Sequence, residues 1–153
     1  MLELWHVLRL PLIIAIALAA LGVAGTTSAE VARHPCVPKS AEIRFRAADG
    51  TRLAGYRLGK GRKAVVLAHQ VRGDACQWSS YAKRLARLGY LVIAVDFRGY
   101  GDSQTRGGRA AFRLAADVAA ATRAARARGA QKVFVVGASM GGTAVLAAAA
   151  NIR

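Results

Sequence analysis

Three continuous apolar runs, separated by helical patterns, constrain the fold of this chain more than any other feature. The runs are KAVVLAH at 63–69, YLVIAVDF at 90–97 and QKVFVVGAS at 131–139. Uninterrupted apolar runs of this length indicate strands that are covered on both faces. Residues 75–89 and 109–128 lie between them with apolar side chains at helical spacing, and a third helical pattern begins at residue 140. This alternation predicts a parallel α/β sheet with right-handed crossovers.

In the segment before these runs, apolar and charged residues alternate with a period of two. In AEIRFRAADG, at 41–50, Ile43 and Phe45 alternate with charged residues, and the pattern ends at Asp49-Gly50. An Asp-Gly pair between alternating segments is a strong hairpin signal. The following TRLAGYRLGKG, at 51–61, therefore predicts a second strand that is antiparallel to the first.

The predicted helix at 109–128 is rich in alanine and arginine. We expect Phe112, Leu114, Val118 and Thr122 on its apolar face and the arginines in solvent. Asp117, in the same segment, is interpreted as a surface acid, as is Asp102 upstream of it.

The stretch FVVGASMGGTAVL at 134–146 places a glycine-flanked serine between a buried strand and a helix. A sharp strand-to-helix turn lifts such a serine out of the sheet but strains its backbone, so only small residues fit two positions before and after it. Gly137 and Gly141 meet this requirement around Ser139. The pattern predicts a nucleophile elbow, and the alternative is a glycine-capped turn with an incidental serine.

With these elements in place, the chain resembles the first half of an α/β-hydrolase fold protein across about residues 41–153. The resemblance rests on His69-Gln70, on DFRGYGDS at 96–103 and on GASMGG at 137–142. It implies a truncated α/β fold in which two antiparallel strands precede parallel strands flanked by helices. It also implies a small-molecule acyl or ester substrate in the full-length form, hydrolysed through an acyl-enzyme on Ser139 without cofactor or metal.

The same resemblance assigns an oxyanion hole. The backbone N–H of Met140 is one implied donor, and the second is an N–H just after His69, from Gln70 or Val71. Gln70 stands where the family commonly has glycine, so the second donor is left open between these two residues. His69 itself is expected to be a structural or oxyanion-loop residue and not the catalytic base.

Residues 96–103 match the family pattern D-x-R-G-x-G-x-S, which the resemblance implies is a structural turn. The acid and the arginine, Asp96 and Arg98, are expected to brace it. The glycines Gly99 and Gly101 are expected to permit the chain reversal, and Ser103 completes the pattern.

The family order places the catalytic acid and then the histidine after the nucleophile, and both are expected to follow Arg153. The chain as given is therefore expected to be inactive alone. Other readings stay open: a non-catalytic truncated remnant or half-module, a secreted serine peptidase or thioesterase, and a basic protein that binds a membrane or wall surface.

The N-terminus predicts export. An uncharged run from Leu10 to Gly25 follows Arg9, and small residues Thr27 and Ala29 are placed for cleavage before Glu30. We expect residues 1–29 to be a signal peptide or, if uncleaved, a membrane anchor, residues 30–40 a linker, and residues 41–153 the partial hydrolase domain. Membrane contact is expected only through an uncleaved N-terminal segment.

Cys36 and Cys76 are the two cysteines of the chain. An exported protein permits a disulfide between them, and two unconnected thiols are the alternative. No cluster of cysteine and histidine has the spacing of metal ligands, so no metal site is expected.

The sequence has 23 Lys and Arg residues against 8 Asp and Glu residues, a formal net charge of +15. Such a charge is compatible with an anionic partner. The basic residues, however, are mostly arginines scattered among alanines, as a GC-rich coding sequence produces, and no basic segment is interleaved with aromatics. We expect no nucleic-acid partner, and the sequence leaves the oligomeric state open.

Overall fold

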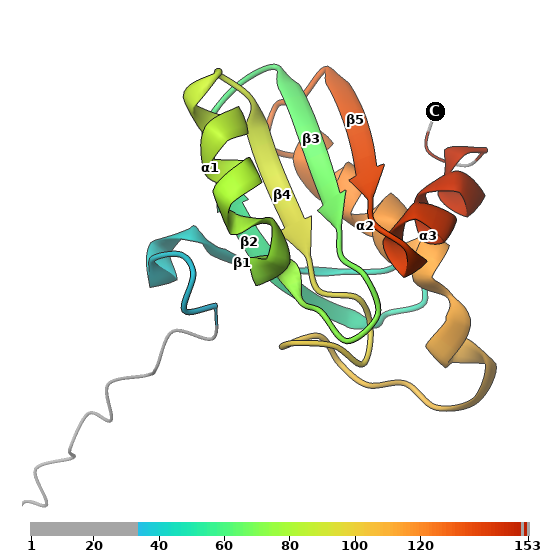
Figure 1. Ribbon diagram of the computed structural model, residues 1–153. Coiled ribbons are helices and arrows are strands. Elements are labelled where there is room, and N and C mark those ends of the chain that lie inside the picture. Colours follow the sequence, from blue (N-terminus) through green and yellow to red (C-terminus); the bar gives the residue numbers. More distant parts are fainter. Residues whose placement is uncertain (1–33, 151, 153) are drawn as a thin grey trace, which may run out of the picture. The chain divides into compact units, whose positions relative to one another are not determined.

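The computed structural model describes residues 34–150 and 152, without the side chains of residues 110 and 111. These residues form one mixed sheet with helices on both faces (Figure 1). The strands are β1 (Glu42–Arg46), β2 (Arg52–Leu58), β3 (Lys63–Ala68), β4 (Leu91–Val95) and β5 (Lys132–Gly137). The α-helices are α1 (Ser79–Arg87), α2 (Leu114–Arg126) and α3 (Met140–Ala149), and short 3-10 helices span Lys39–Ala41, Ala75–Trp78 and Gly108–Phe112.

The strand order is β1-β2-β4-β3-β5, and it combines the two predicted patterns. The Asp49-Gly50 hairpin joins β1 to β2, and β2 pairs antiparallel with β4. The three apolar runs pair in parallel as β4, β3 and β5. The α/β architecture predicted from the sequence is therefore confirmed.

Two apolar layers separate the helices from the sheet. On one face, Ala82 and Leu85 of α1 pack with Tyr56, Leu67 and Val92. On the other face, α2 contributes Ala121, Ala124 and Ala125, while Ala144 and Ala148 of α3 pack against Val118. The parallel strands β3 and β4 are covered on both sides, which explains their uninterrupted apolar sequences. The same expectation was wrong for the third run, because β5 is the edge strand of the described sheet and Phe134 is 41% exposed.

The helix expected at 109–128 begins later than the pattern indicated. Arg113 has φ −84° and ψ 44°, outside the helical region, so the 3-10 helix Gly108–Phe112 does not continue into α2. Phe112 is consequently 85% exposed instead of lying on the buried face.

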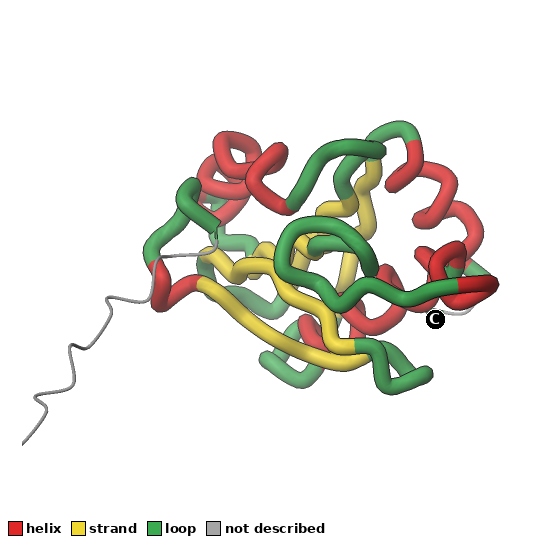
Figure 2. Tube along the Cα trace, turned by 90° about the horizontal axis from the view of Figure 1, so that it is seen from below, coloured by secondary structure: helices red, strands yellow, loops and turns green. Residues whose placement is uncertain are grey.

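The carboxyl ends of the parallel strands meet at one edge of the sheet. The loops after β3 and β4 and the start of α3 gather there, and Figure 2 looks onto this edge from below. In open α/β sheets such edges collect functional groups.

The segment that precedes β1 packs against the domain. His34 and Val37 are buried, although residues 30–40 were expected to be a linker. A disulfide joins Cys36 to Cys76, with the two Cα atoms 5.7 Å apart. The predicted signal segment at 1–29 lies outside the described residues. Within 34–150 and at 152, no helix has the length and apolarity needed to span a bilayer.

Candidate active site

Ser139 lies between β5 and α3, in the turn that the sequence predicted. Its backbone has φ +48° and ψ −116°, a region that non-glycine residues rarely adopt. Strain of this kind persists only where the surrounding structure imposes it, and it is concentrated at functional sites. The serine is exposed, so its hydroxyl faces solvent at the carboxyl edge of the sheet.

The two flanking glycines are required by contact. A Cβ on Gly137 would overlap the backbone of Gly141, and a Cβ on Gly141 would overlap the carbonyl of Ala68 in β3. The backbone N–H of Ala138 donates to the same Ala68 carbonyl over 3.1 Å. The turn is therefore pressed against the neighbouring strand, and this close approach holds the serine in its strained conformation.

Met140 is the first residue of α3, so its N–H belongs to the helix-terminal groups that have no acceptor within the helix. Its side chain is held by Tyr100, whose hydroxyl donates to the Met140 Sδ over 3.6 Å. This geometry suits the oxyanion donor that the sequence assigned to Met140.

The two alternatives for the second donor differ in their contacts. The Gln70 N–H donates to the Gln77 Oε1 over 3.0 Å, which occupies it. Val71 is 49% exposed, and among the hydrogen bonds of the described residues none uses its N–H. Arg72, the next residue, has φ +61° and so turns the loop sharply after Val71. The geometry favours Val71 over Gln70 for this role.

His69 is fully buried and both of its ring nitrogens are engaged. Nδ1 donates to the Gln70 carbonyl over 2.7 Å, and Nε2 accepts the Phe97 N–H over 3.1 Å. The ring packs edge-on against Phe97 and Tyr100. Burial lowers the pKa of His69, which favours the neutral ring. His69 therefore fixes the loop that carries Val71 and has no free lone pair with which to act as a base.

His34 is the second histidine of the described region, and its Nε2 contacts the buried Asp96 Oδ2 over 2.8 Å. The hydrogen bond to Asp96 raises the pKa of His34, against the opposing effect of its burial. Burial alone would raise the pKa of Asp96, but the hydrogen bonds from His34 and from the N–H groups of Asp102 and Ala75 outweigh it and lower that pKa. The pair is a buried His–carboxylate interaction.

Sequence reasoning missed this pair, because His34 is 62 residues from Asp96 and lies in the predicted linker. One signal was available: His34 stands two residues before Cys36, which the disulfide anchors to the domain.

Asp96 is engaged on all sides in the turn that follows β4. Its carboxylate fills the space where a Cβ of Gly101 would lie, and its carbonyl accepts the Ser103 hydroxyl over 2.6 Å. Gly99 and Gly101 both have positive φ, at +79° and +47°. The geometry is that of a structural brace, as the resemblance implied.

Arg98 lies in the same turn with its side chain fully buried, and it binds two acids. Its guanidinium donates from Nε and Nη2 to Asp117, and from Nη1 to the Asp49 Oδ2 over 2.8 Å. Arg98 and Thr51 hold the pKa of Asp49 well below its usual range. Burial raises the pKa of Asp117, and the hydrogen bonds from Arg98 oppose that effect.

The interpretation of Asp117 as a surface acid was wrong, since the residue is 0% exposed. The signal was its place on the helix: Asp117 lies three residues after Leu114 and directly before Val118, on the apolar face. Asp102 has a 25% exposed side chain and lies 3.9 Å from Arg44.

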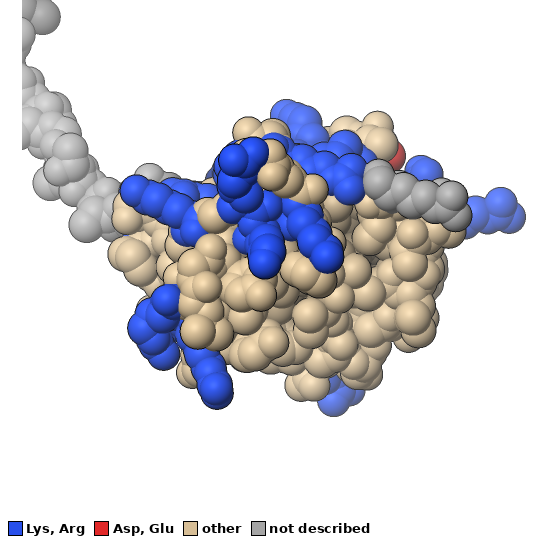
Figure 3. Space-filling view, turned by 90° about the horizontal axis from the view of Figure 1, so that it is seen from above, with Lys and Arg blue, Asp and Glu red and all other residues tan. Residues whose placement is uncertain are grey.

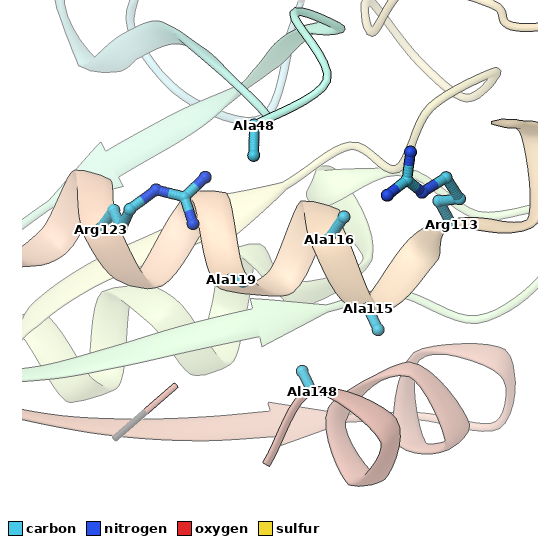
Figure 4. A pocket seen from close by; sticks show the side chains of 7 residues that line it. All are labelled: Ala48, Arg113, Ala115, Ala116, Ala119, Arg123 and Ala148. Atoms are coloured by element: carbon cyan, nitrogen blue, oxygen red, sulfur yellow. The ribbon is translucent and has the colours of Figure 1, made fainter. Parts of the chain in front are cut away.

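A separate hollow of about 510 Å³ lies along α2 (Figure 4). Alanines of α2 form its floor, and Arg113 and Arg123 stand at its two ends. None of the elbow or oxyanion-loop residues lines it. Among the described residues there is also no group of three or more acids, histidines or cysteines that could hold a metal ion.

A family model described as "Serine aminopeptidase, S33" matches residues 59–153. The chain belongs to the α/β-hydrolase family. Figure 1 shows the elements that the match covers, from β3 to α3. No curated protein sequence matches the chain.

Solved structures of hydrolases share the fold. An esterase from Exiguobacterium antarcticum has a TM-score of 0.61 and 28% identity, over 71% of this chain and 39% of its own. Epoxide hydrolase A from Mycobacterium thermoresistibile has a TM-score of 0.61 and 31% identity, over 71% and 34%. An epoxide hydrolase from Vigna radiata, at 20% identity, shows the fold alone. The chain spans little more than a third of the length of these proteins.

Proposed function

We propose that the full-length protein is a serine hydrolase of carboxylic esters, and that this chain supplies its nucleophile and oxyanion hole. The observation that carries the proposal is the strained, exposed Ser139 at the start of α3. Its turn stands beside a helix N-terminus and a loop with an available N–H at Val71. These are the groups that acyl transfer needs at the carbonyl carbon and at the developing oxyanion.

The residue type at the elbow favours acyl substrates over epoxides. A serine alkoxide that opened an epoxide would form an ether, which water does not cleave. A serine that attacks an ester forms an acyl-enzyme, which water hydrolyses to regenerate the free hydroxyl. Ser139 thus supports the ester chemistry that the name of the Exiguobacterium relative indicates, and not the epoxide chemistry of the other neighbours.

The mechanism divides between this chain and groups outside it. The Ser139 Oγ attacks the carbonyl carbon, and the N–H groups of Met140 and Val71 donate to the oxyanion. The serine proton goes to a base and then to the leaving alcohol. Within the described residues neither histidine can serve as that base, because His69 has both ring nitrogens engaged and His34 is buried with no ring nitrogen exposed. We propose that the base and its acid lie outside residues 34–152.

Hydrolysis of a short p-nitrophenyl ester tests the proposal. The 153-residue chain should show little or no turnover. A longer chain, which also includes the residues that the same reading frame encodes after residue 153, should be active. Ser139→Ala should abolish that activity, whereas Ser80→Ala, at an exposed serine of α1, should not change it. Turnover that survives Ser139→Ala would remove the serine from the mechanism.

Amide hydrolysis is the second candidate, since the matching family model is described as an aminopeptidase. The same elbow serves both bonds, and the two differ in the leaving group. An amino-acid p-nitroanilide, assayed beside the ester, separates them. A higher kcat/KM on the anilide would assign the protein as a peptidase.

We also propose export of the protein. The disulfide between Cys36 and Cys76 supports this, because such bonds persist in oxidising compartments. N-terminal sequencing of the protein recovered outside the cytoplasm should begin at Glu30. A mature protein that begins at Met1 would favour the anchor interpretation of residues 1–29.

A further inference from the structure

The end of the sheet opposite Ser139 is formed by three loops that pack tightly together. They precede β3, β4 and β5 and comprise residues 59–62, 88–90 and 127–131. A Cβ on Gly59 would overlap the Tyr90 carbonyl, and a Cβ on Gly61 would overlap the Gly89 carbonyl. The N–H groups of Gln131 and Lys132 both donate to the Arg62 carbonyl, over 2.7 and 3.1 Å. The loops therefore present one continuous surface.

This surface is strongly basic, and we call it the basic end. Its exposed cations are Lys60, Arg62, Lys63, Arg87, Arg126, Arg128 and Lys132. The segments that carry them, 57–63, 83–90 and 123–132, contain no Asp or Glu. Figure 3 looks onto this end and shows Lys and Arg side chains gathered along the upper part of the face, with almost no red among them.

The acids of the described domain gather elsewhere. Asp74 follows β3, Asp96 and Asp102 follow β4, and Asp49 and Asp117 bind Arg98 beside that turn. Glu42 accepts the N–H of His34, which itself binds Asp96. The acids of the described residues are therefore confined to the other end of the strands, where cations such as Arg44 and Arg113 accompany them, and the basic end has cations alone. A compositional bias toward arginine raises the total charge but does not exclude acids from one end of the sheet.

Stabilisation of helix ends by cations explains only some of the Lys and Arg residues of the basic end. Cations in the last turn of a helix stabilise its carboxyl terminus, which explains Arg87 in α1 and Arg126 in α2. Lys60 and Arg62 are on a loop that follows no helix. Lys63 and Lys132 are register partners at the first positions of two adjacent parallel strands, where like charges repel.

An exposed apolar side chain lies among these cations. Leu88, directly after α1, is 66% exposed. With Gly89, Tyr90, Arg62 and Lys63 it lines a hollow of about 360 Å³. A leucine surrounded by cations suits a surface that presents anionic head groups above an apolar layer.

We propose that the basic end docks the protein on an anionic phospholipid bilayer, with Leu88 entering the interface between Arg62, Lys63 and Arg87. Ser139 then faces away from the bilayer, at the opposite edge of the sheet. Nucleic acid suits this surface less well, because single strands bind through stacked aromatic rings. Leu88 offers no ring, and the two rings near this end, Tyr90 and Phe134, pack edge-on against each other at 6.4 Å, with the Lys132 Nζ 5.2 Å from the Phe134 ring.

Flotation of the full 153-residue chain with vesicles tests the proposal. Phosphatidylcholine vesicles with about 30% phosphatidylglycerol are compared with pure phosphatidylcholine at about 0.1 M salt, where the Debye length is about 10 Å. The pure vesicles measure any binding by the apolar N-terminal run that does not depend on charge. We expect at least tenfold stronger binding to the anionic vesicles.

Matched variants locate the contact. Arg62→Ala with Lys63→Ala should weaken anionic binding about 25-fold, since each cation near such a surface is worth about fivefold. Arg52→Ala with Arg109→Ala removes the same charge from exposed residues of other segments and should cost less than threefold. Leu88→Ser leaves the charge unchanged and should weaken binding about fivefold or more, because an apolar contact is lost.

Equal binding to both vesicle types, or equal losses in the two double variants, would overturn the proposal. The proposal would also be overturned if the chain did not bind the vesicles but bound duplex DNA or single-stranded RNA in a way that depends on Arg62 and Lys63. That last outcome would assign the basic end to nucleic acid. Near-ultraviolet circular dichroism of each variant confirms that the fold is unchanged.

Discussion

Replacing Asp117 by alanine should be among the most destabilising single changes in the domain. The carboxylate is fully buried and accepts from the Arg98 Nε, Nη2 and backbone N–H. Its removal leaves a buried guanidinium with one remaining acid, Asp49, at 2.8 Å. Breaking a buried pair by removing one partner costs about 3–5 kcal/mol. Because Asp49 stays in place, we expect a loss of about 3 kcal/mol in the free energy of unfolding.

Urea unfolding followed by tryptophan fluorescence measures this loss, and Asp102→Ala is the matched control. Asp102 is also an acid near the turn after β4, but it is 25% exposed and 3.9 Å from an exposed Arg44. A pair of that kind contributes about 1 kcal/mol or less. Asp117→Asn keeps the shape of the side chain but not its charge, so its loss in the free energy of unfolding should lie between those of Asp117→Ala and Asp102→Ala. If Asp117→Ala and Asp102→Ala cost the same, the argument from burial is wrong.

Further changes test other parts of the structure. Gly141→Ala should abolish Ser139-dependent activity and lower stability, because its Cβ overlaps the Ala68 carbonyl, whereas Gly107→Ala, whose Cβ meets nothing within 4 Å, should change neither. Thiol titration of the exported protein should find no free cysteine, and Cys36→Ser with Cys76→Ser should cost about 4 kcal/mol for a loop spanning 40 residues. His34→Asn should cost more at pH 5.5 than at pH 9: the raised pKa of His34 gives stability that is complete below about 6.5 and is lost as pH rises through the folded value. A pH-independent loss would contradict the ion pair.

Local patterns predicted most of the fold. The runs at 63–69, 90–97 and 131–139 became β3, β4 and β5. For β3 and β4 the reason is that strands buried on both faces need uninterrupted apolar sequence, whereas β5 is only partly buried at the sheet edge. The turn around Ser139 was equally predictable from the sequence, because the close packing at positions 137 and 141 excludes any side chain and so requires glycine. The start of α2 was not, because the pattern of Phe112 and Leu114 fits a helix and only the backbone at Arg113 breaks it.

The contacts that position the site were harder to predict, because they join distant parts of the chain. His34 meets Asp96 across 62 residues, and Arg98 meets Asp117 across 19 residues and Asp49 across 49. The Gln77 side chain that occupies the Gln70 N–H lies only 7 residues away, yet nothing in its local pattern indicates this contact. Periodicity reports which face is buried and carries no information on which polar groups meet there.

The packing of the elbow on β3 links the state of Ser139, the proposed nucleophile, to the assembly of the sheet. The strained backbone of Ser139 depends on Gly141 lying against the Ala68 carbonyl and on the bond from the Ala138 N–H to that carbonyl. Both contacts require β5 to have joined β3 in its final register, in which Ala68 pairs with Gly137. A nascent or partly unfolded chain thus carries an ordinary, unreactive serine. Covalent labelling of Ser139 in the active protein would then detect only molecules in which β5 has paired with β3. The labelled fraction would therefore measure how much of the protein has folded.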